Sequence, residues 1–184
     1  MTAIVLAALL ANPAIPYADE KSAPAELVQS IKARRAGGTL LNLDRMLLNS
    51  PAFAKGWNAM FGAIRTGLAV PALLREISIL AVAVQNHADY EWVQHEPEFL
   101  KAGGTQAQLA ALKKLDDAPF DEVGKATLAL AIEMTRDVKV KPETMKRVRA
   151  ALPNDQAVEL IGTIAGYNMV SRFLLATGVE AEGK

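Results

Sequence analysis

Helix start and stop signals recur along nearly the whole chain. A proline or a capping residue opens most segments, because the fixed φ of proline suits the first helical turn, and glycine closes several of them. This punctuation predicts helices over about 26–33, 51–67, 71–86, 89–102, 106–115, 119–136, 142–151 and 154–177. We therefore expect an all-α fold, a single-domain helical bundle.

Two segments depart from this simple pattern. The run from Ile77 to Val84 alternates and is rich in β-branched residues, which also suits a buried strand. Leucines precede it without a turn signal, so its length favours a buried helix. Pro97 would remove a hydrogen bond to the carbonyl of Val93 inside a helix, and we expect a kink or a break just after His95.

Composition limits the chemistry that the chain can perform. Lysine plus arginine equals aspartate plus glutamate at 20 each, so the sequence offers no broad basic field for a nucleic acid. The chain has no cysteine, which excludes disulfides, thiolate metal ligands and thiol redox chemistry. Its only histidines are His87 and His95, too few for an imidazole zinc site. We expect no metal and no cofactor.

Residues 1–14 form an apolar segment, and we expect the domain proper to span residues 15–184. A secretory signal would carry a lysine or arginine before its apolar stretch, and this segment has none. The segment is also too short to cross a bilayer as a helix. We expect a cytoplasmic protein with no membrane partner, in which this arm packs on a neighbouring subunit. The alternative is an exported protein whose apolar segment is a cleaved signal.

Glu76, Glu91 and His95 are the candidate catalytic residues. Glu91 and His95 are four residues apart, so on a helix they share one face. Glu76 stands beside Arg75 at the head of the apolar run, where burial would raise its pKa towards neutrality. Together they predict a proton relay. Two alternatives stay open: Arg75 and Glu76 form a surface pair, and His95 closes a structural network between helices.

Other side chains could complete a pocket around this relay. Tyr90 and Trp92 are expected to line a substrate site, although Trp92 suits a core equally well. Arg172 could clamp a substrate carboxylate through its two-pronged guanidinium, or pair with a glutamate across a subunit contact. His87 lies near a predicted helix end, where a capping or solvent-facing role is favoured.

Several segments resemble the carboxymuconolactone decarboxylase family, which includes the alkylhydroperoxidase D-like proteins. The matching segments are 38–47 followed by Ser50-Pro51, then 75–77, 90–97, 102–103 and 166–173, and the resemblance extends from about residue 15 to 179. It implies an all-α fold in which the motif helices form a pocket near a subunit interface. It also implies a homo-oligomer, a trimer or a hexamer.

The redox branch of that family carries a glutamate, two cysteines separated by two residues, and a histidine four residues after the second cysteine. In this sequence the glutamate is Glu76, the cysteine positions are Ala88 and Glu91, and the histidine is His95. A peroxide-reducing cycle needs an attacking and a resolving thiol, so thiol peroxidase activity is excluded. Glu91 turns a redox position into an acid–base one.

These residues lead to a hypothesis of a cofactor-independent lyase that decarboxylates a small carboxylated lactone or ring compound. His95 would donate a proton or hydrogen-bond the developing oxyanion, Glu76 would orient it, and Glu91 would complete the relay. One alternative is a non-enzymatic oligomeric protein that binds a small molecule. Another is a metal-dependent enzyme that uses Glu76, Glu91 and His95 as ligands.

Overall fold

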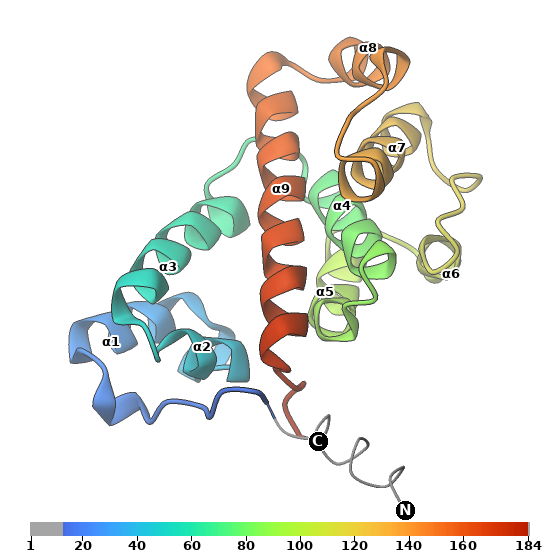
Figure 1. Ribbon diagram of the computed structural model, residues 1–184. Helices are drawn as coiled ribbons and strands as arrows, with labels where there is room; N and C mark the ends of the chain where they lie inside the picture. Colours follow the sequence, from blue (N-terminus) through green and yellow to red (C-terminus); the bar gives the residue numbers. More distant parts are fainter. Residues whose placement is uncertain (1–12, 184) are drawn as a thin grey trace, which may run out of the picture. The chain divides into compact units, whose positions relative to one another are not determined.

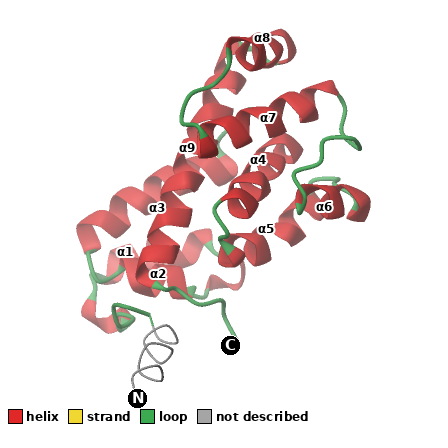
Figure 2. Ribbon diagram, turned by 45° about the vertical axis from the view of Figure 1, so that its right-hand side comes forward, coloured by secondary structure: helices red, strands yellow, loops and turns green. Residues whose placement is uncertain are grey.

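The computed structural model of the protein describes residues 13–183, and most of the apolar arm predicted at residues 1–14 lies outside this range. Across these residues it has nine α-helices and two short 3₁₀ helices, with no strand (Figure 2). The predicted all-α fold is confirmed. Within the same range, none of the helices combines the length and the apolar character that crossing a membrane requires.

Backbone contacts divide the chain into two compact units. One unit is Gly67–Arg172, and the other joins the residues up to Thr66 with those from Phe173 onward. Glu76, Glu91 and His95 all belong to the first of these units. The predicted boundary between an arm and a domain near residue 15 stays a prediction.

The unit that carries the candidate residues is built around α4, which packs against α5, α6 and α7, while α7 also packs against α8 (Figure 1). Its helices are α4 Ala72–Gln85, α5 Asp89–Lys101, α6 Gln106–Leu112, α7 Glu122–Arg136, α8 Pro142–Ala151, and α9 Asn154–Thr177 as far as Arg172. Because α4 lies between α5 and α7, side chains on more than one face of this helix are shielded from water.

The apolar run on α4 forms the centre of this unit. Every residue from Glu76 to Ala83 is buried, and Ile79, Leu80 and Val82 are fully so. A helix that is apolar on most sides is stable only when other helices cover it, as α5 and α7 do here. The preference for a helix over a strand in this run is confirmed.

A tight turn at His87 places α5 beside α4. His87 has a positive φ of 56°, and the N–H of Ala88 bonds to the carbonyl of Ala83 at 2.8 Å, which closes α4 with a left-handed residue. Helix α5 then begins at Asp89. It continues through Pro97 to Lys101, so the break expected after His95 is absent. His87 is exposed, as expected for a residue at a helix end.

The other unit contains η1 Glu20–Ser22, α1 Ala25–Arg34, η2 Ala36–Gly38, α2 Asn42–Leu47, α3 Pro51–Thr66 and the end of α9. On α3, the ring of Trp57 contacts the rings of Phe53 and Phe61. Phe53 and Trp57 also contact Phe173.

The sequence did not predict α2, because no capping side chain precedes this short helix. Instead Asp44, inside the helix, accepts the N–H of Leu41 at 2.9 Å, and Arg35 donates two bonds to its carboxylate at 2.6 and 2.8 Å. Asp44 is 1% exposed, so these partners compensate the burial of its charge. The start of α2 therefore depends on a contact with a residue outside the helix.

Gly104, just after α5, should tolerate no side chain. A β-carbon there would lie 2.1 Å from Cε1 of Phe99, a fully buried residue of α5. We expect Gly104→Ala to lower the free energy of unfolding by about 1–3 kcal/mol. Gly162→Ala on α9 is the control, because its β-carbon meets nothing within 4 Å and alanine favours a helix. Urea denaturation should show only the first variant destabilised; equal loss in both would contradict the packing.

Candidate functional site

Glu76 and His95 form a buried pair that joins α4 to α5. Nδ1 of His95 lies 2.7 Å from Oε2 of Glu76, and the two residues are 4% and 0% exposed. Nε of Arg75 donates to the other carboxylate oxygen at 3.3 Å, which places a positive charge beside the negative one. A carboxylate acceptor fixes the proton of the imidazole on Nδ1 and orients the ring. In the neutral ring, Nε2 is then the basic nitrogen.

Glu91 lies in a different environment, although it shares a helix face with His95. It is 1% exposed, Ser171 of α9 hydrogen-bonds its Oε2, and its Oε1 has no hydrogen-bond partner. Burial raises the pKa of the Glu91 carboxyl to about 8, and the bond from the Ser171 hydroxyl acts in the opposite direction. At pH 7 the folded protein therefore holds Glu91 mostly as a neutral acid.

Two residues of α9 face the pair on α5. Ser171 meets Glu91, and Tyr167 meets His95 with its ring edge-on, at 5.0 Å between centroids and an interplanar angle of 89°. Both pairs are spaced by four residues and run in opposite chain directions, as expected for antiparallel helices. The sequence reasoning gave Ser171 no role. Its spacing from Tyr167, which matches that of Glu91 and His95, was the available signal.

Asn168 anchors this part of α9. Its amide nitrogen donates to Oγ1 of Thr135 on α7 at 2.9 Å, and its amide oxygen accepts from Asn86, the residue that caps α4, at 3.2 Å. Farther along, the side chain of Glu159 accepts the N–H of Val70 at 2.8 Å. These bonds hold α9 in register with the helices that carry Glu76 and His95.

The remaining predicted residues have other contacts. Tyr90 is buried at 8% exposure. Trp92 is half-buried, donates to Glu96 of its own helix at 2.7 Å, and lies under the ammonium of Lys113 at 5.1 Å. Arg172 is exposed and donates to Asn168, one turn earlier in α9. The structure therefore joins Glu76 to His95 and places Glu91 beside Ser171, whereas the substrate-binding roles stay predictions.

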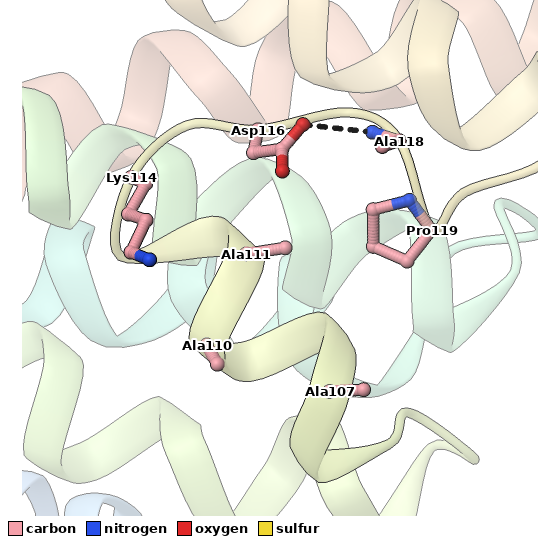
Figure 3. A pocket seen from close by; sticks show the side chains of 7 residues that line it. All are labelled: Ala107, Ala110, Ala111, Lys114, Asp116, Ala118 and Pro119. Carbon is pink, nitrogen blue, oxygen red and sulfur yellow. Dashed lines mark hydrogen bonds between the residues drawn. The ribbon is translucent and has the colours of Figure 1, made fainter.

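A shallow surface groove of about 450 Å³ lies between α6 and the loop that leads to α7 (Figure 3). Alanine side chains form much of its wall, with Lys114 and Asp116 at its edge. Asp116 is held in place by a bond from the N–H of Ala118 at 3.0 Å. None of the predicted site residues lines this groove.

The metal-dependent alternative would need Glu76, Glu91 and His95 to converge on one ion. Within residues 13–183, no group of three or more histidine, aspartate or glutamate side chains is arranged to hold a single metal ion. Glu76 directs its carboxylate to His95 and Arg75, and Glu91 directs one oxygen to Ser171.

Comparison with protein families gives one assignment. The model of the carboxymuconolactone decarboxylase family matches residues 51–133, which include Glu76, Glu91 and His95. Residues 51–133 belong to the carboxymuconolactone decarboxylase family. The predicted resemblance is thereby confirmed. No curated protein sequence gives a significant match to this chain.

Solved structures of similar fold extend over nearly the whole chain. A peroxidase-related protein from Ralstonia eutropha JMP134 with an alkylhydroperoxidase AhpD core aligns with a TM-score of 0.80 at 16% identity, over 93% of both chains. A peroxidase-related protein from Silicibacter sp. TM1040 gives 0.79 at 19%, over 92% of this chain and 91% of that one. A cysteine-to-alanine variant of the debrominase Bmp8, in complex with 2,3,4-tribromopyrrole, gives 0.78 at 16%, over 94% of both. These likenesses establish the alkylhydroperoxidase D-like fold.

The stability of the protein should depend on pH through Glu91. Between the ordinary pKa of 4.5 and about 8, only the folded state holds the proton, so unfolding releases it. The free energy of unfolding should therefore fall by up to about 1.4 kcal/mol per pH unit over this range and level off above it.

Urea denaturation from pH 4.5 to 9 gives the free energy of unfolding at each pH. The contribution of Glu91 is the difference in slope between the wild type and a variant that lacks this carboxyl group. Glu91→Gln removes the titrating group and should flatten the slope. Glu122→Gln is the control, because its side chain is 83% exposed, and it should keep the slope of the wild type. Parallel curves for the wild type and Glu91→Gln would contradict the assignment.

Proposed function

We propose that the protein is a cofactor-independent lyase that decarboxylates a small carboxylated lactone or ring compound by acid–base chemistry. The single observation that carries this proposal is the burial of the Glu76–His95 pair together with Glu91, because α5 then carries, one turn apart, a fixed imidazole and a carboxyl group that is neutral near pH 7. The family match over the same residues supports it.

Decarboxylation makes two demands on such a site. Loss of carbon dioxide breaks a carbon–carbon bond and leaves its electron pair conjugated with a carbonyl group as an enolate. The site must stabilise the oxyanion and deliver one proton to carbon, which it later regains from solvent. A site with a neutral acid, to give the proton, and a carboxylate–imidazole pair, to bind the oxyanion, can meet both demands.

Each residue of the cluster then has a role. Glu91 donates the proton to carbon, because it still holds its proton at the pH where most carboxyl groups have lost theirs. The doubly protonated form of His95, with its Nδ1 bonded to Glu76, hydrogen-bonds the oxyanion through Nε2. Arg75 supports the ionised form of Glu76 through its contact at 3.3 Å.

Thiol chemistry is outside this proposal, because the chain has no cysteine. The similar structures described as peroxidase-related or as a debrominase share the fold at 16–19% identity, and fold alone does not fix function. A homo-oligomer, a cytoplasmic location and a carboxylate clamp at Arg172 stay predictions. The alternative is a non-enzymatic binding protein of the same fold. Product analysis distinguishes it from the lyase.

The proposal is tested by mass spectrometry of products formed from a panel of carboxylated lactones and aromatic acids. The wild type should release carbon dioxide from at least one compound. His95→Gln should slow that turnover by about 10²–10³-fold, since the loss of one positioned hydrogen-bond donor to an oxyanion costs about that much. Circular dichroism should show the variant folded.

The other histidine of the chain provides a matched control. His87 is exposed and has a positive φ, a conformation that asparagine tolerates well, so His87→Asn should keep full turnover. Binding of panel compounds without any product would favour the non-enzymatic alternative. Full turnover in His95→Gln would remove His95 from the chemistry.

A further inference from the structure

Ser171 is a buried residue that the proposed reaction has not used. It is fully buried on α9, and its Oγ lies within hydrogen-bond distance of two oxygens, Oε2 of Glu91 and the backbone carbonyl of Tyr167 at 2.9 Å. A hydroxyl group has one proton and two lone pairs. Ser171 can therefore donate to only one of these oxygens at a time.

The two protonation states of Glu91 require opposite directions for this bond. When Glu91 is a neutral acid, a proton on its Oε2 finds an acceptor in Ser171, whose own proton then goes to the carbonyl of Tyr167. A proton on Oε1 would have no acceptor, because that oxygen has no hydrogen-bond partner. When Glu91 is ionised, the Ser171 hydroxyl can turn and donate to the carboxylate instead.

We propose that Ser171 is a positioning residue whose hydroxyl rotates between the Tyr167 carbonyl and Glu91, so that Glu91 can give up its proton inside the core. This inference deepens the acid–base function proposed above and rests on it for its catalytic meaning. The rotation itself takes place in the protein without substrate, so it can be tested there.

The burial of the pair makes the rotation matter. An ionised carboxylate with no hydrogen-bond donor in an apolar interior is costly, and Ser171 is the donor that the described structure places on Glu91. The other titratable groups of the cluster are His95 on the same helix, Glu76 with Arg75 on α4, and Tyr167 on α9. Burial stabilises the acid form of Glu91 and so makes loss of its proton costly. A hydrogen bond from the Ser171 hydroxyl to the carboxylate lowers that cost.

Carboxyl carbon NMR on protein labelled with ¹³C at glutamate tests this role directly. The Glu91 signal is identified by its loss in Glu91→Gln, and its titration is followed from pH 5 to 10. In the wild type the midpoint should lie near the pKa of about 8 given by burial. In Ser171→Ala it should move up by about one pH unit, because a hydrogen bond to a charged group is stronger than one to a neutral group.

Two further variants separate the hydroxyl from the packing. Ser171→Thr keeps a hydroxyl and should keep the midpoint of the wild type. Ser171→Cys keeps the shape but offers a weak donor, so its midpoint should rise, and it decides the matter if Ser171→Ala fails to fold.

Thr163→Val is the matched control on the same helix. Thr163 is fully buried, and its hydroxyl bonds to the carbonyl of Glu159 at 2.8 Å, one turn earlier, just as Ser171 bonds to Tyr167. This variant removes a buried hydroxyl that contacts no carboxylate, so the Glu91 midpoint should stay unchanged. An equal shift in Thr163→Val would mean a general loss of packing and would overturn the proposal.

Two other outcomes would also overturn it. One is a midpoint that stays unchanged or falls in both Ser171→Ala and Ser171→Cys. The other is a wild-type Glu91 that titrates near 4.5, because the acid form would then be absent at rest. No substrate enters this titration, so its failure would leave the decarboxylase proposal standing, and a failed product assay would leave the titration unaffected.

Discussion

The bond between Glu76 and His95 is the interaction on which the candidate site depends. It joins the central helix α4 to α5 at a point where both side chains are almost completely buried. A buried carboxylate is costly unless it is paired, and here the imidazole on one oxygen and Arg75 on the other provide the compensation. The apolar run that follows Glu76 on α4 is buried as well, so the pair lies in a part of the protein from which water is excluded.

The two glutamates of the candidate site, both buried, lie in different environments. Glu76 has a cationic neighbour and an imidazole, whereas Glu91 has a single hydroxyl group and an oxygen without a hydrogen-bond partner. Burial therefore acts on Glu91 with little to oppose it, and its pKa rises to about 8. A site arranged in this way has one carboxyl group, Glu76, to orient the imidazole and a neutral acid, Glu91, to hold a proton.

The chain keeps the family fold while it lacks the sulfur on which a thiol mechanism depends. Similar structures described as peroxidase-related, or as a debrominase studied as a cysteine-to-alanine variant, align over nearly all of it at 16–19% identity. Such identity preserves the helical framework and leaves the chemistry free to change. Glu91 stands where the redox motif that the sequence resembles would have its second cysteine, and its hydrogen-bond partner Ser171 comes from α9, outside the residues that the family model matches.

The sequence by itself determined most of the helices and, because it has no cysteine, excluded thiol chemistry. Prolines, caps and glycines located most of the described helices to within a few residues, because these signals act within one turn, and the four-residue spacing placed Glu91 and His95 on one face. It did not determine α2, which begins through Asp44 and Arg35, or the continuation of α5 through Pro97. Tertiary structure decided that Arg75 meets Glu76 in the interior, that Arg172 bonds within its own helix, and that Ser171 meets Glu91. The last contact spans 80 residues of sequence, and only the packing of α9 against α5 brings its partners together.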